Sequence, residues 1–121
     1  INKMKQKKMK IKGAKILIMG LTFKENCADI RNSGIQSVIT KLKKFGCTLD
    51  LYDPWADKIE IKNEYNIFPI SKLSKNTYDS ILIAVAHKKF KKMGIKFISN
   101  LGKKNHVIFD FKYLFSKYTI Y

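Results

Sequence analysis

The chain has 121 residues, of which 45% are apolar and 28% charged. This composition is that of one globular domain and excludes a disordered, collagen-like or repeat protein. Its 25 basic and 9 acidic residues give a formal net charge of +16. Cys27 and Cys47 are too few and too isolated for a disulfide scaffold or a structural zinc site, and they suit a reducing cytosol. The apolar runs fall far short of the roughly 20 residues that span a bilayer, so we expect no membrane helix. The basic segment 3–15 is followed by too few apolar residues for a signal peptide, so we expect no export signal and a cytoplasmic location.

The excess of positive charge leaves several interpretations open. Lysine accounts for all but one of the 25 basic residues, and Arg31 is the exception. Residues that read base edges or clamp phosphates favour arginine for its planar fork, whereas an AT-rich genome favours Lys and Ile through its codons. The charge is therefore compatible with codon bias on a neutral fold, with attraction of an anionic nucleotide, or with binding of nucleic acid.

The first core pattern follows a lysine-rich segment, residues 3–12. The segment 14–19 is apolar except for Lys15 and is bounded by Gly13 and Gly20. It predicts a strand that is buried on both faces. The loop that follows, residues 20–33, is long for a connection in a compact domain. Ordered loops of this length commonly carry function.

The rest of the chain alternates between helical and strand patterns. Asn32 or Ser33 is expected to cap a helix that ends before Gly46, because apolar residues recur there at helical spacing. Residues 56–65 predict a short helix with Ile59 on its inner face, and the segment from Asn66 to Ile70 is at most an edge strand. The other predicted elements are strands at 47–52, 80–86 and 106–111, and a helix at 90–101 that Gly94 weakens.

This alternation predicts an α/β fold: a three-layer, Rossmann-like parallel sheet with helices on both faces. In such a sheet, ligands bind outside the carboxyl ends of the strands. The polar residues of the sequence gather after those ends, at 20–24, 53–55, 86–88 and 110–112. A site is therefore expected at that edge.

The turn at Gly20 begins like a dinucleotide-binding turn, but it lacks the second and third glycines of the G-x-G-x-x-G pattern. Without them, a pyrophosphate cannot approach the backbone as closely. We therefore do not expect this domain to hold NAD in a standard Rossmann pocket.

Several motifs occur in an order that resembles a known family. Gly20-Leu21-Thr22-Phe23-Lys24 follows the first strand and leads to Asp29-x-Arg31-x-Ser33, and Tyr52-Asp53-Pro54 follows the second strand. Tyr78-Asp79 precedes the third strand, and Asp110-x-Lys112 ends the fourth. Residues 13 to 113 in this way resemble the C-terminal, nucleotide-sugar-binding domain of the UDP-glucose/GDP-mannose dehydrogenase family. The amino-acid sequences of segments 24–27 and 53–56 resemble those of one branch of this family, which oxidises UDP-N-acetylhexosamines for O-antigen and capsule synthesis.

The resemblance implies a role for some residues. Phe23, Lys24 and Lys112 match positions that contact the UDP-sugar, and Arg31 matches an arginine that reaches NAD. It also implies that residues 1–12 end a linker or central helix, and that 13–121 form the C-terminal domain of a longer enzyme.

The same resemblance implies chemistry that lies outside this chain. An upstream domain would bind the NAD that accepts two hydrides from C6 of the sugar. An upstream cysteine thiolate would form a thiohemiacetal and then a thioester, which water hydrolyses. No catalytic residue is expected here, and Cys27 does not match that nucleophile. The isolated chain should be inactive, and its partners should be the UDP-sugar, the upstream domains and further copies in a homodimer or larger assembly, with no nucleic acid and no membrane.

Individual residues keep alternative interpretations. Asp53 could bind a ribose or form only an Asp-Pro turn, and His87 could cap a helix or act in catalysis. Trp55 could pack in a core or interface, or serve as a stacking platform, and Arg31 could form only a salt bridge with Asp29. The competing function for the whole chain is a basic Rossmann-like module that binds nucleic acid, and a scaffold that has lost its ligand is a third possibility.

Overall fold

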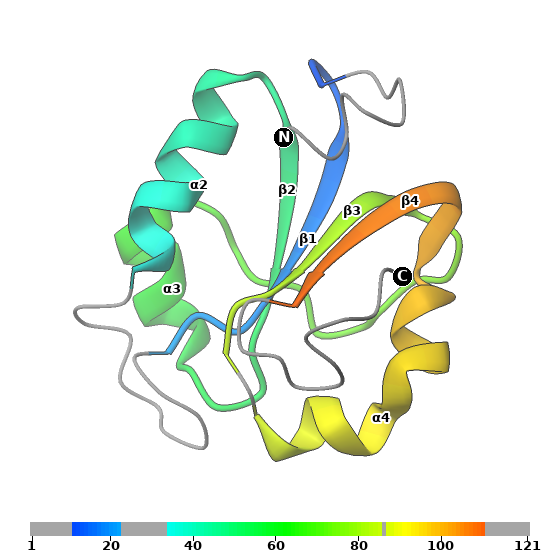
Figure 1. Ribbon diagram of the computed structural model, residues 1–121. Coiled ribbons are helices and arrows are strands. Elements are labelled where there is room, and N and C mark those ends of the chain that lie inside the picture. The colour runs from blue at the N-terminus through cyan, green and yellow to red at the C-terminus, as the bar shows by residue number, and fades with distance from the viewer. Residues whose placement is uncertain (1–10, 23–33, 86, 111–121) are drawn as a thin grey trace.

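The fold is an open parallel sheet covered by helices (Figure 1). The computed structural model describes residues 11–22, 34–85 and 87–110. Within these residues the strands are all parallel and lie in the order β2-β1-β3-β4. The strands are β1 (Lys15–Met19), β2 (Thr48–Tyr52), β3 (Tyr78–Ile83) and β4 (Gly102–Asp110), and the helices are α2 (Ile35–Lys44), α3 (Lys58–Tyr65) and α4 (Lys88–Ser99).

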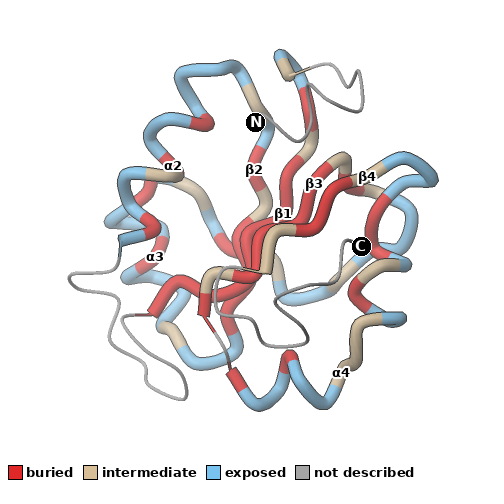
Figure 2. Tube along the Cα trace, in the orientation of Figure 1, coloured by how far each residue is buried: buried red, intermediate tan, exposed pale blue. Residues whose placement is uncertain are grey.

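Central strand β1 divides the core into two layers. Ile16 and Ile18 pack with α2 and α3 on one face of the sheet, whereas Leu17 and Met19 pack with α4 on the other. The alternation follows from the pleat, which turns successive side chains to opposite faces. Figure 2 shows the burial concentrated along the strands, with exposed residues on the outer sides of the helices. The predicted three-layer, Rossmann-like fold is confirmed.

Helix α3 corrects one expectation. Ile59, predicted on the inner face, is 67% exposed, whereas Ile61 and Tyr65 are buried in the core. The helix begins after Asp57, whose carboxylate accepts hydrogen bonds from the backbone N–H groups of Ile59 and Glu60. This cap fixes the start of the helix, so that the pair at i and i+4, rather than Ile59, faces the sheet.

Other boundaries also differ from the sequence pattern. The N-cap of α2 is Gly34, whereas Asn32 and Ser33, the caps expected from the sequence, lie outside the described part. The segment 66–70 is not a strand, although the Ile70 N–H donates to the Leu51 carbonyl oxygen at 2.8 Å. Strand β3 starts earlier than predicted and ends earlier, at Ile83, so residues 84 and 85 lie outside the strand.

Helix α4 contains a kink at Gly94, whose φ of 82° and ψ of 155° are not helical. Gly94→Ala should destabilise the protein by about 1–2 kcal/mol, because a Cβ is disfavoured at positive φ, and no heavy atom lies within 4 Å of the added carbon. The measurement is urea unfolding followed by circular dichroism.

Gly34→Ala is the matched control for this substitution. Its site is equally open, but its φ of −65° is one that alanine adopts readily. The loss should therefore stay below about 1 kcal/mol, the cost of alanine at an N-cap. Equal losses in the two variants would contradict the backbone explanation of the kink.

Candidate functional site

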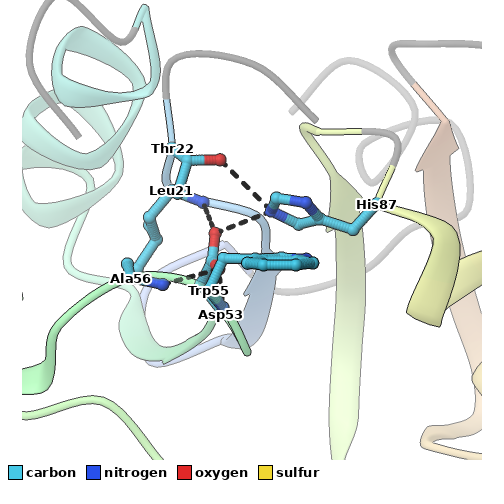
Figure 3. Close-up of polar contacts among 6 residues, drawn as sticks. All are labelled: Leu21, Thr22, Asp53, Trp55, Ala56 and His87. Atoms are coloured by element: carbon cyan, nitrogen blue, oxygen red, sulfur yellow. Dashed lines mark hydrogen bonds and ion pairs between the residues drawn. The ribbon is translucent and has the colours of Figure 1, made fainter. Parts of the chain in front are cut away.

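Three loops meet at the carboxyl edge of the sheet. They follow β1, β2 and β3, and they bring together Leu21, Thr22, Asp53 and His87 (Figure 3). From β1 the chain continues to β2, which lies on one side of β1 in the sheet. It then crosses to β3 on the other side of β1 and continues outward to β4. The crevice between β1 and β3 is therefore the point where the strand order reverses, which is where open α/β sheets bind ligands. The predicted gathering of polar residues at this edge is confirmed for Thr22, Asp53 and His87.

Asp53 is the centre of the arrangement. Its Oδ2 accepts hydrogen bonds from the Leu21 N–H at 2.7 Å and from His87 Nε2 at 3.1 Å. Its Oδ1 accepts from the Trp55 N–H at 2.7 Å and the Ala56 N–H at 3.1 Å. The side chain has no exposed surface. Because both oxygens are used inside the protein, the geometry supports the turn interpretation of Asp53 and leaves no oxygen for a ribose.

The environment of Asp53 holds it in the charged form. Burial alone would raise the pKa of its carboxyl group, but the hydrogen bonds from His87, Leu21 and Trp55 outweigh burial. The pKa of Asp53 therefore lies below its usual value. A carboxylate with several donors is stabilised in this way because every donor favours the negative form.

His87 is buried as completely as Asp53. It occupies the N-cap position of α4, but its side chain makes no cap hydrogen bond. Its Nε2 lies 3.1 Å from Asp53 Oδ2 and 3.2 Å from Thr22 Oγ1, and its ring makes an edge contact with Phe90 at 5.2 Å between centroids. A fully covered imidazole cannot reach a substrate, so this position does not support the catalytic interpretation.

Trp55 borders this buried group on the outside. Its side chain is 48% exposed, and its ring centroid lies 6.4 Å from that of His87. A core role for Trp55 is therefore excluded. An interface and a stacking role both stay compatible with its position.

The residues that the sequence singled out for ligand binding lie outside the described part of the chain. This holds for Phe23, Lys24, Arg31 and Lys112, and also for Cys27. Their nearest described neighbours sit at the expected edge of the sheet. Thr22, which is 1% exposed, directly precedes Phe23. Asp110 ends β4 two residues before Lys112.

Thr22, which is buried and contacts His87, was not predicted from the sequence. It stands at a variable position of the matched Gly-x-x-Phe-Lys pattern, so the motif gave no signal for it. Asp53 and His87 were both named, but their contact with each other joins residues 34 positions apart. Only the strand order brings the two together.

The opposite edge of the sheet carries a different set of charges. Tyr78 donates its hydroxyl hydrogen to Asp50 at 2.6 Å, and Lys15 Nζ lies 3.9 Å from the same carboxylate oxygen. Burial and this hydrogen bond raise the pKa of Tyr78. A shallow pocket of about 490 Å³ lies nearby, where Asp79 pairs with Lys103 at 3.2 Å. We call the residues that line it the amino-edge pocket: Lys12, Gly13, Ala14, Asp79, Lys103, Lys104 and Asn105.

Two classes of site receive no support from the described residues. Within ranges 11–22, 34–85 and 87–110, the His, Cys, Asp and Glu side chains form no group that could hold a metal ion. Over the same ranges, none of the helices has the length and apolar character needed to cross a membrane. Cys47 is a free, half-buried thiol whose pKa is raised by burial, and its Sγ contacts the Ile11 carbonyl oxygen at 3.5 Å.

The sheet order is that of an open α/β domain, a class that binds ligands in the crevice beyond the carboxyl ends of its strands. Comparison with known proteins is more specific. Residues 17–117 match the model of the UDP-glucose/GDP-mannose dehydrogenase family, UDP binding domain. The chain belongs to the UDP-glucose/GDP-mannose dehydrogenase family.

Individual relatives agree with this assignment. The chain is 45% identical to the UDP-N-acetyl-D-glucosamine 6-dehydrogenase of Salmonella typhi, and the match covers 94% of the chain and 27% of that protein. It is 41% identical to the enzyme of the same name from Pseudomonas aeruginosa, with the same coverage of 94% and 27%. The solved UDP-N-acetyl-mannosamine dehydrogenase Cap5O of S. aureus has the same fold, with a TM-score of 0.68 and 24% identity over 98% of this chain and 26% of that one. The chain thus spans about a quarter of the length of these relatives.

Proposed function

We propose that this chain is the C-terminal nucleotide-sugar-binding domain of an NAD-dependent UDP-sugar 6-dehydrogenase. The observation that carries the proposal is the 45% identity to the Salmonella typhi enzyme over 94% of the chain. The proposed substrate is a UDP-N-acetylhexosamine, and the reaction oxidises its C6 hydroxyl to a carboxylate with reduction of two NAD. The product would enter O-antigen or capsule polysaccharide.

The proposed binding residues lie around the carboxyl edge. Lys24 pairs with the diphosphate as a charge-assisted donor, and Phe23 packs on the ligand. Lys112 follows β4 and contacts the substrate as a point charge rather than as the fork that arginine supplies. Arg31 reaches toward NAD. The position of Thr22 and Asp110 at this edge supports the assignment.

The chain's own residues do not fit NAD in a Rossmann pocket. The acid that follows the second strand in such pockets hydrogen-bonds the ribose, whereas both oxygens of Asp53 are engaged inside the protein. A Cβ at Gly20 would lie 2.7 Å from Val85, so the first turn packs on the protein itself. The main NAD site, and the catalytic cysteine, are therefore assigned to other parts of the enzyme.

The proposal extends to the assembly. The domain would act with an NAD-binding and a central helical domain of the same protein, in a cytoplasmic enzyme that forms a homodimer or larger oligomer. Residues 1–12 would end the linker or central helix, and residues 13–121 would form the domain. A preparation of the 121 residues alone should not reduce NAD.

The test is NADH production by the protein from the complete open reading frame that contains these residues. UDP-N-acetylglucosamine, UDP-N-acetylgalactosamine, UDP-glucose and GDP-mannose are offered in turn. Two NADH formed per UDP-N-acetylhexosamine would support the proposal. Folded protein that turns over none of the four would contradict it.

Lys24→Ala in this enzyme should raise the KM for the UDP-sugar. The loss of a charge-assisted hydrogen bond is worth about 1.5–3 kcal/mol, which corresponds to about 10- to 100-fold in KM. Lys41→Ala, an exposed lysine of α2, removes the same charge away from the site and should leave KM unchanged. Equal KM values for the two variants would contradict the proposal that Lys24 contacts the UDP-sugar.

Family membership favours this function over the basic module that binds nucleic acid. The competing hypothesis rests on the net charge of +16. It predicts binding to DNA or RNA that falls steeply with salt, and no preference for UDP-sugars. The two functions are separated by measuring, on one preparation, how the affinities for nucleic acid and for a UDP-sugar change with salt concentration.

A further inference from the structure

The three loops of the carboxyl edge are joined through a single buried polar group. Thr22 Oγ1 and Asp53 Oδ2 both contact His87 Nε2, at 3.2 and 3.1 Å, and Asp53 also holds the Leu21 N–H at 2.7 Å. Thr22 comes from the loop after β1, Asp53 from the loop after β2 and His87 from the loop after β3 (Figure 3). We call these three residues the loop clamp. It links segments that are 31 to 65 positions apart in the chain.

The direction of these hydrogen bonds follows from the charge on Asp53. A carboxylate only accepts hydrogen bonds, and Asp53 Oδ2 already accepts from Leu21. A bare Nε2 facing this oxygen at 3.1 Å would set two lone pairs against each other. The imidazole proton therefore lies on Nε2, where it is shared between Asp53 and the Thr22 hydroxyl oxygen.

Stability alone does not explain why polar residues, rather than apolar ones, fill the position of the loop clamp. Buried polar groups are costly to desolvate, and well-packed apolar residues commonly give equal or greater stability. Hydrogen bonds, unlike apolar contacts, are directional, so a buried polar group holds the backbone segments that it joins in one geometry. Here it fixes Leu21 and Thr22, the residues that directly precede Phe23 and Lys24.

We infer that Thr22, Asp53 and His87 are positioning residues for the UDP-sugar site, because their buried hydrogen bonds fix the backbone from which Phe23 and Lys24 extend. This inference rests on the proposed function. None of the three touches the ligand: each acts through the loop after β1. Their effect should therefore appear in substrate binding and depend on the hydrogen-bonding atoms rather than on side-chain volume.

The test uses Thr22→Val and His87→Gln in the enzyme from the complete reading frame. Valine keeps the shape of threonine and removes the hydroxyl, whereas glutamine keeps a donor near the position of Nε2. We expect Thr22→Val to raise KM for the UDP-sugar about 10- to 100-fold, the cost of a small misplacement, with a much smaller change in kcat. Thr22→Ser should restore KM to nearly the wild-type value, and His87→Gln should give an intermediate KM.

Tyr78→Phe is the matched control. It also deletes one buried hydroxyl, but at the opposite edge of the sheet, where Tyr78 donates to Asp50. It should lower Tm about as much as Thr22→Val and leave KM unchanged.

The outcomes separate the inference from the function on which it rests. No turnover of any UDP-sugar by the unmodified enzyme contradicts both. Turnover by the unmodified enzyme, with equal KM in Thr22→Val, Thr22→Ser and Tyr78→Phe, contradicts the positioning role alone. A KM that rises in Thr22→Val and recovers in Thr22→Ser supports it. If Thr22→Val does not fold, a wild-type KM in His87→Gln overturns the inference.

Discussion

Asp53→Asn will lower the free energy of unfolding at pH 7 by about 3–5 kcal/mol, the usual cost of removing one member of a buried charged network. The carboxylate accepts four hydrogen bonds, from Leu21, His87, Trp55 and Ala56. An asparagine amide offers one oxygen and turns its NH₂ group toward donors. Urea unfolding of wild type and variant measures the difference.

The difference in the free energy of unfolding between wild type and Asp53→Asn will depend on pH. The pKa of Asp53 in the folded protein lies below the usual value of an aspartate. The charged carboxylate therefore contributes its full stability above the unfolded pKa, and this contribution is lost as the pH falls through the folded value. The stability gap between the two proteins should narrow below about pH 4.

Asp57→Asn is the control for this pair of measurements. Asp57 caps α3 from an exposed position, and asparagine caps helices about as well as aspartate. Its stability should stay within about 0.5 kcal/mol of wild type. A gap for Asp53→Asn that does not change between pH 7 and pH 3 would show that the carboxylate is not the source of the effect.

Gly20→Ala will destabilise the protein by about 2–5 kcal/mol, the sum of a backbone cost and an overpacking cost. Its φ is +100°, and an added Cβ would lie 2.7 Å from both the Cβ and the backbone nitrogen of Val85. The residue therefore sets the distance between the loops after β1 and β3. Thermal unfolding by calorimetry gives the loss.

Gly13→Ala isolates the contribution of the contact with Val85. Gly13 has a φ of +82°, but nothing lies within 4 Å of its added Cβ. It should lose only the backbone part, about 1–2 kcal/mol. If both alanine variants lose the same stability, the close approach between the loops contributes nothing.

The sequence predicted the layers well because the strands are marked by apolar runs. Residues 16–19 and 81–86 are unbroken apolar runs; β1 contains all of the first, and β3 contains the first half of the second. The ends of the strands were harder to predict where they depend on a contact with a residue far away in the sequence. Tyr78 joins β3 because its hydroxyl reaches Asp50 and its ring is buried. Strand β4 starts at Gly102 rather than His106, through exposed polar residues that show no apolar signal.

The candidate site was predicted in position but not in detail. Asp53 and His87 each stood after a strand, so their placement at the carboxyl edge followed from the fold class. Their mutual contact and the link to Thr22 depend on the order β2-β1-β3, in which β1 has both other strands as neighbours. Local patterns carry no information on that order. The assignments of Phe23, Lys24, Arg31 and Lys112 stay predictions, because these residues lie outside the described part of the chain.

The central claim is that the carboxyl edge of the sheet binds a UDP-sugar. Its most direct test is hydrogen exchange of the enzyme from the complete reading frame, with and without UDP-N-acetylglucosamine, followed peptide by peptide. The account predicts slower exchange in peptides that cover 19–24 and 84–90, and unchanged exchange at the amino-edge pocket around Lys103 and Lys104. Protection at that pocket, with none at the carboxyl edge, would contradict it.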